Sequence, residues 1–244
     1  SEEIIEHFKN TRHYDVASYN NDLLFIFNNI REFHNRNHLI GIHQRMNGAV
    51  PMHIYHYVVM TYVYSGTFHM TIEDKHIALH AGDLVIFDRN VPHGVAMTGV
   101  HDLGINIILN DSYFTHSFIN VLPPTHILTK FFNELMTRGQ SHTHYLIYTP
   151  GEDQTIRNTI DNILCEYLDS KALSDQIIDN YIMILLTHLS RINTYQDNIP
   201  TNKNHQLIET IFDYVQNHYQ EGSLQDACRN LGYSSSYASK IIKK

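Results

Sequence analysis

The sequence predicts an α+β protein: a β-barrel or sandwich first, a helical layer after it, and an all-α helix-turn-helix unit at the end. Short runs rich in β-branched and aromatic residues recur between residues 52 and 109, with turn residues between them. The hydrophobic period then becomes helical between residues 112 and 193. Residues 222–244 finally fit two short helices joined by a tight turn.

The strand-like runs can be taken in chain order. Two early runs, 23–27 and 38–44, are separated by Asn and His clusters. Residues 52–64 are expected to form one long strand that ends at a Ser-Gly turn. Further short strands are expected at 67–73, 76–80, 84–87, 94–97 and 103–109. Many short strands with regular turn signals favour a sandwich or a small barrel.

Helical spacing follows the strands. It covers residues 112–121, 127–138, 154–168 and 175–193. In the last helix, Ile177 and Ile184 widen the apolar stripe beyond what one packing face requires. The stripe either covers the barrel or pairs in part with a second subunit, as a two-fold symmetric DNA site would demand. The sequence leaves both readings open.

The expected domain division follows from these patterns. Residues 1–110 form the barrel, and 111–194 form a helical layer suited to dimerisation. Residues 195–204 are polar, contain Pro200 and lack periodicity, so they are expected to be a linker. Residues 205–244 would then be the first helix-turn-helix unit of a DNA-binding domain, incomplete as it stands.

The C-terminal unit has recognisable caps and faces. Ser223 can cap one helix, and Gly232 follows that helix where a left-handed residue is needed. Ser234 can cap the next helix, whose outer face carries small hydroxyls and amines. Residues of this kind meet DNA on a recognition helix. The candidates for operator contact are Ser235, Ser236, Tyr237, Ser239 and Lys240.

Composition limits the function classes. The chain has no run of eighteen apolar residues and no basic-then-apolar start, so neither a membrane span nor a signal peptide is expected. Cys165 and Cys228 fall far apart in predicted helices, which favours a reducing cytoplasm over a disulfide framework. The net charge is −8, yet residues 201–244 carry five Lys or Arg against four Asp or Glu. This net charge of +1 gives residues 201–244 little electrostatic attraction for DNA.

The order of these motifs resembles the AraC/XylS family of transcriptional regulators across essentially the whole chain. The N-terminal half is similar to a cupin-type sensor domain, with His53, the turn Tyr62-Val-Tyr-Ser-Gly66, and Gly82-Asp83 followed by Pro92-His93. The C-terminal run Gly232-Tyr-Ser-Ser-Ser-Tyr-Ala-Ser-Lys240 resembles the family's first helix-turn-helix. The resemblance implies an effector-sensing barrel that controls DNA binding.

Two features depart from the family pattern. The family has two helix-turn-helix units joined by a long helix, whereas this sequence ends after the first, so a truncated chain is expected. Ala238 stands where the family usually has a larger aliphatic residue, which would loosen packing of the recognition helix.

The residues at the metal-ligand positions of the barrel favour a sensor over an enzyme. Cupin metal sites use two His two residues apart, a Glu further on and a His from the second motif, all on one strand face. Here Tyr55 and Val59 stand in place of the second His and the Glu, so only His53 and His93 are well placed. No Ser-His-Asp or Cys-His arrangement is legible. We therefore expect no enzyme, no metal and no cofactor.

The expected effector site is the barrel interior. The inward-facing candidates are Arg45, His53, Tyr55, Tyr57, Thr61 and His93. Hydroxyl, imidazole and guanidinium groups suit a small polar ligand, and a sugar fits best. A fatty acid, a filled barrel without a ligand, and a proton sensor built on histidine remain open alternatives.

Together these observations predict a cytoplasmic, homodimeric AraC-type regulator. Its partners would be double-stranded operator DNA and a small effector, without a membrane. The alternative is a cupin metalloenzyme or small-molecule-binding module that does not bind DNA. The sequence leaves the effector, the operator, and the choice between activator and repressor open.

Overall fold

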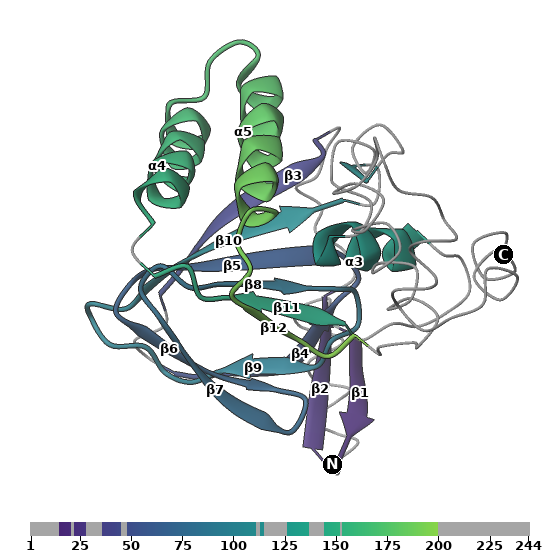
Figure 1. The fold of residues 1–244 in the computed structure, drawn as a ribbon. Coiled ribbons are helices and arrows are strands. Elements are labelled where there is room, and N and C mark those ends of the chain that lie inside the picture. Colours follow the sequence, from purple (N-terminus) through teal and green to yellow (C-terminus); the bar gives the residue numbers. More distant parts are fainter. Residues whose placement is uncertain are drawn as a thin grey trace, which may run out of the picture.

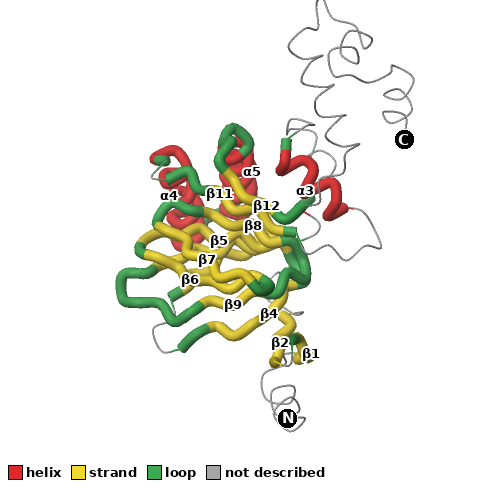
Figure 2. The backbone as a smooth tube through the Cα atoms, turned by 60° about the horizontal axis from the view of Figure 1, so that its bottom comes forward, coloured by secondary structure: helices red, strands yellow, loops and turns green. Residues whose placement is uncertain are grey.

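The computed structural model describes residues 15–20, 22–27, 36–44, 48–110, 113–114, 126–136, 144–151 and 153–199. Within these residues two six-stranded sheets face each other, and the helices lie on the outer side of one sheet (Figure 1). Figure 2 shows the strands stacked together, with the helices along one side of the stack. The expected DNA-binding unit, residues 205–244, lies outside the described residues.

The first sheet has the strand order β1-β2-β4-β9-β6-β7. Its pairs are antiparallel except β2 with β4, which run parallel. The strand bounds are β1 Asp15–Tyr19, β2 Asp22–Phe27, β4 Val50–Tyr55, β9 His93–Val95, β6 Thr67–Ile72 and β7 Lys75–His80. This sheet lies on the side of the barrel away from the helices (Figure 1).

The second sheet has the order β12-β11-β8-β5-β10-β3, and all its pairs are antiparallel. Its inner face packs against the first sheet and its outer face against the helices. The strand bounds are β12 Tyr195–Asp197, β11 Tyr145–Tyr148, β8 Leu84–Phe87, β5 Val58–Ser65, β10 Leu103–Leu109 and β3 His38–His43.

The central strand β5 shows why this sheet has two apolar faces. Val59 and Val63 belong to the core between the two sheets, whereas Met60 and Tyr62 belong to the core under the helices. Side chains of a strand alternate between faces, so a strand buried on both sides needs an unbroken apolar run. The sequence of β5 meets this need, with Thr61 as a polar exception that is only 4% exposed.

The strand expected over residues 52–64 is in fact two strands. β4 ends at Tyr55 and β5 begins at Val58, and the two belong to different sheets. The chain bends at His56 and Tyr57, and Asn90 donates its backbone N–H to the Tyr55 carbonyl at 2.9 Å. Both strands are β-branched and aromatic, so composition does not mark the bend between them.

Three of the described strands, β1, β11 and β12, are not among those expected from the sequence. β11 is a four-residue run without alternation because it is buried on both faces. β12 lies within the polar stretch expected to be a linker, and its three residues are exposed. Its pairing with β11 explains its position, since Leu146, Ile147 and Tyr148 face Asp197, Gln196 and Tyr195 in register.

Three helices of the described chain cover the second sheet, as expected for the helical layer. They are α3 Ile127–Met136, α4 Gln154–Asp169 and α5 Ser174–Leu189. Asp153 caps α4 by accepting the backbone N–H groups of Thr155 and Ile156. Most of the helix expected at 112–121 lies outside the described residues.

Polar contacts fix α5 to the edge strand β3. His38 is fully buried, and its Nδ1 lies 2.7 Å from Asp179 Oδ1. Asp179 also accepts Asn37 Nδ2 at 3.1 Å, and its carbonyl accepts the Tyr113 hydroxyl at 2.9 Å. A buried polar group is tolerated only when it is hydrogen-bonded, so this cluster sets the position of α5.

The turn after β5 depends on a glycine. Gly66 has φ +74°, and a Cβ there would lie 2.0 Å from Asp102 Oδ1. Asp102 accepts the backbone N–H of Thr67 at 2.9 Å and of Gly99 at 2.6 Å, which lowers the pKa of its carboxyl. The Ser-Gly turn of the sequence is therefore a backbone requirement.

Candidate functional site

A cavity of about 270 Å³ lies inside the barrel, between the two sheets. Strands of both sheets contribute to its wall, which mixes aliphatic side chains with polar ones. Its polar or aromatic lining residues are Phe27, His43, Gln44, His53, Tyr55, Thr61, His93 and Asn106. A concave, largely apolar site with a few converging polar groups is the usual form of a small-molecule site.

A histidine pair forms one wall of this cavity. His53 on β4 and His93 on β9 are cross-strand partners, and their ring centroids lie 4.2 Å apart. Both side chains are almost fully buried, with 2% and 4% exposed. They come from motifs forty residues apart in the sequence, and the pairing of β4 with β9 brings them together.

Hydrogen bonds to the backbone fix the tautomer of both rings. His53 Nδ1 lies 2.9 Å from the Pro51 carbonyl, and His93 Nδ1 lies 2.9 Å from the Val91 carbonyl. A carbonyl oxygen only accepts, so each Nδ1 carries the hydrogen. In the neutral ring, Nε2 then keeps its lone pair and is an acceptor.

Burial keeps both rings neutral. Desolvation lowers the pKa of His53 to about 4; the bond to Pro51 opposes this shift, and His43 adds to it. Desolvation and the neighbouring His53 hold the pKa of His93 well below its ordinary value, although its bond to Val91 opposes them. Neither imidazole offers a positive charge to a ligand near neutral pH.

Aromatic contacts hold the pair in place. The Phe87 ring stacks on His93 with centroids 4.1 Å apart and an interplanar angle of 7°. Phe27 meets the edge of His53 at 5.1 Å and stacks on Tyr55 at the same centroid distance. Ring packing and hydrogen bonds together therefore fix the orientation of the His53 and His93 rings, and with it the direction of their Nε2 acceptors.

The second sheet contributes a donor. Thr61 on β5 and Asn106 on β10 are cross-strand partners, and the Thr61 hydroxyl donates to Asn106 Oδ1 at 2.9 Å. With Oδ1 engaged, the amide nitrogen of Asn106 remains as a hydrogen-bond donor at the cavity wall. Asn106 faces Gly41 on the other side, where no side chain competes for the space.

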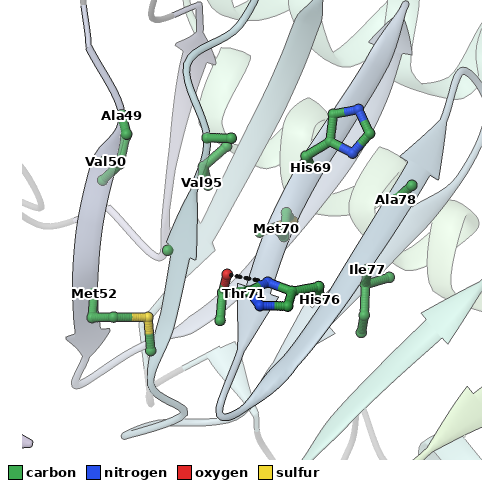
Figure 3. A pocket seen from close by; sticks show the side chains of 12 residues that line it. Ala49, Val50, Met52, His69, Met70, Thr71, His76, Ile77, Ala78 and Val95 are labelled. Atoms are coloured by element: carbon green, nitrogen blue, oxygen red, sulfur yellow. Dashed lines mark hydrogen bonds between the residues drawn. The ribbon is translucent and has the colours of Figure 1, made fainter. Parts of the chain in front are cut away.

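A second hollow, of about 580 Å³, lies on the first sheet and is lined by residues of β4, β6, β7 and β9 (Figure 3). Its polar residues are the exposed His69 and His76 and the half-buried Thr71, and the Thr71 hydroxyl lies 3.1 Å from His76 Nδ1. It is larger than the interior cavity but shallow and mostly apolar. The interior cavity gathers the converging polar groups, and we take it as the candidate site.

Four predicted effector residues line the interior cavity: His53, Tyr55, Thr61 and His93. Tyr57 lies in the bend between β4 and β5 and is not among the residues that line this cavity. Beyond the bend, Val59 and Thr61 line the cavity and keep the inward parity counted from His53. Arg45 lies outside the described residues, as do Ser235, Ser236, Tyr237, Ser239 and Lys240.

The sequence analysis did not select His43, Gln44, Phe27 or Asn106. Asn106 had a usable signal, since it is the one polar residue in the apolar run of β10. The other three depend on how their strands are placed in the sheets, which local pattern does not show.

Across the described residues, no three His, Cys, Asp or Glu side chains lie close enough together to hold a metal ion. Among the same residues, no helix is long and apolar enough to cross a membrane.

One protein-family model matches part of the barrel. Residues 45–104 match the family model described as the cupin domain. A search of curated proteins gives no significant match.

Several solved structures are similar to this chain at low sequence identity. Unsaturated fatty acid-bound ToxT from Vibrio cholerae has 10% identity and a TM-score of 0.39, over 85% of this chain and 73% of that chain. Another ToxT crystal structure from this organism gives a TM-score of 0.41 at 10% identity, over 85% and 76%. KdgF from Halomonas sp. has 18% identity and a TM-score of 0.28, over 30% and 70%.

Proposed function

We propose that this chain is a cytoplasmic transcriptional regulator of the AraC type, whose cupin barrel binds a small effector and controls operator binding. The observation that carries the proposal is the polar interior cavity, built from His53, Tyr55, Thr61 and His93. The match to the cupin domain over residues 45–104 supports the sensor assignment.

A sugar is the proposed effector. The cavity of about 270 Å³ lies just below the usual range of roughly 300–1,000 Å³ for drug-sized ligands, so it suits a ligand of monosaccharide size. Stacked aromatic rings such as Phe27 and Tyr55 add flat faces against which a sugar ring can pack. A long acyl chain would need a longer apolar channel.

Residues 205–244 are proposed to bind operator DNA. The sequence pattern supports this role, with Ser235, Ser236, Tyr237, Ser239 and Lys240 on the outer face of the second helix. The hydroxyl and amine groups would contact base edges and phosphates. A weakly basic unit should bind DNA with a shallow dependence on salt.

Homodimerisation is proposed to use α5. Ile177 and Ile184 stay 38% and 43% exposed on α5, while Ile178, Ile182 and Leu185 of the same helix are buried against the barrel. The buried part of the apolar stripe covers the barrel. The exposed part, Ile177 and Ile184, is proposed to pack against a second copy of the chain.

Two measurements test the proposal on the protein expressed from its own gene. Selection of bound fragments from random duplex DNA should enrich one sequence, and Lys240→Ala should weaken binding to it. A thermal-shift screen against neutral monosaccharides should raise the unfolding temperature, since a ligand of the folded state stabilises it. Failure to enrich any sequence would refute the DNA-binding part.

The runner-up is a cupin metalloenzyme or a binding module without DNA. The paired Nε2 acceptors of His53 and His93 are the one observation that favours a metal. Elemental analysis that finds a stoichiometric transition metal in the purified protein would favour this alternative.

A further inference from the structure

We infer that the barrel cavity selects an uncharged polyhydroxy ligand against its carboxylate analogue, and that Asn106 is the residue that sets this specificity. The inference rests on the proposed effector site and adds the electrostatic and hydrogen-bond pattern that a ligand must match. It does not depend on DNA binding.

The first step concerns the acceptors. The Nδ1–H groups of His53 and His93 are engaged by the carbonyls of Pro51 and Val91, each at 2.9 Å. The rings therefore offer Nε2 lone pairs and no N–H to a ligand in the cavity. A hydroxyl group can donate to such an acceptor, whereas a carboxylate oxygen meets it lone pair to lone pair.

The second step concerns the donor. The Thr61 hydroxyl donates to Asn106 Oδ1 at 2.9 Å, and this bond orients the amide. The amide nitrogen can then donate to a hydroxyl oxygen of the ligand, while the histidine acceptors receive hydroxyl hydrogens. A ligand that both donates and accepts matches this wall, and a polyol does so with every hydroxyl.

The third step concerns charge. Of the described side chains that line the cavity, none is Lys, Arg, Asp or Glu. A carboxylate placed there would lose its hydration without gaining an ion pair, and burying an unpaired charge costs far more than burying a hydroxyl. The described wall therefore disfavours acids.

Matched ligand pairs test the inference directly. Galactose with galacturonic acid, and glucose with glucuronic acid, share a ring and its hydroxyl groups and differ at C6, where a carboxylate replaces the hydroxymethyl group. Thermal shift and calorimetry at pH 7.5 should show at least ten-fold tighter binding of the neutral member of one pair. Tighter binding of the acid, or binding of neither member, would overturn the inference.

Variants assign the role to Asn106. Asn106→Asp keeps the shape and can still accept from Thr61, but it replaces the donor by a charge, so it should weaken neutral-sugar binding ten-fold or more. Asn106→Leu should weaken it similarly. Thr71→Val is the matched control, because Thr71 lies in the outer hollow, and it should leave binding unchanged.

Two further readouts keep the test decisive. The unfolding temperature and circular dichroism of each variant without ligand show that its barrel is folded. Zinc or nickel chloride alone, added to metal-free protein, should not compete with the sugar. A metal ion that binds stoichiometrically and displaces it would overturn the inference, since the Nε2 lone pairs would then serve the metal. Failure of DNA selection would leave these results unaffected, so the two proposals can fail separately.

Discussion

Lowering the pH should destabilise the barrel through its buried histidines. His53 has a pKa of about 4 in the folded protein, against an ordinary value of 6.5. The unfolded chain therefore binds a proton at this position at a higher pH than the folded chain does. Stability from His53 is fully present above pH 6.5 and is lost as the pH falls toward 4.

The magnitude follows from the two pKa values. At pH 5 the unfolded state is protonated at this position and the folded state is not, which lowers the free energy of unfolding by about 2 kcal/mol relative to pH 7.5. His93, which is also buried and neutral, adds to the loss in the same direction.

Urea unfolding followed by circular dichroism at pH 7.5, 6 and 5 measures the effect. Other groups also titrate in this range, so the informative quantity is the difference between wild type and His53→Asn. The asparagine amide can still donate to the Pro51 carbonyl but does not titrate. Its unfolding free energy should fall by about 2 kcal/mol less between pH 7.5 and 5. Equal losses in the two proteins would refute the reasoning.

Three other predictions concern the frame around the site. Gly66→Ala should lower the free energy of unfolding by more than about 1 kcal/mol in urea titration, because φ is +74° and the new Cβ would clash with Asp102; no change would contradict the strain. Asp179→Ala should cost about 1–3 kcal/mol by the same assay, since it leaves His38 buried without its acceptor, and a neutral result would mean that water replaces it. Ile184→Glu should shift a dimer toward monomer in analytical ultracentrifugation with an unchanged far-ultraviolet spectrum; an unaltered mass would exclude this face as the interface.

The strands of the barrel were largely predictable, because turn chemistry marks their ends. Ser65-Gly66 and Gly82-Asp83 punctuate the chain where the backbone needs a positive φ, at Gly66 and Gly82. The bend at Tyr57 was not predictable, since it separates two runs of the same composition. Because the bend is not marked, a continuous strand is expected there, and Tyr57 is expected to face the cavity with His53 and Tyr55.

The candidate site was predictable in part for a related reason. His53 and His93 stand in recognisable motifs, so their convergence could be expected before the structure. Asn106 reaches the cavity because β10 pairs with β5 in one particular register, opposite Thr61. Long-range register of this kind is set by the whole sheet, and local sequence does not encode it.

The second sheet also links distant parts of the chain in one straight row. Gly41, Asn106, Thr61, Val85, Ile147 and Gln196 are successive cross-strand partners in that row. The row starts at the cavity wall and ends in β12, three residues before the described chain stops at Ile199. Only β8 and β11 separate β5 from β12, so a ligand that displaces β5 would act on β12 through these two strands. β12 is thus the last strand of the sheet whose strands β3, β5 and β10 contribute to the cavity wall.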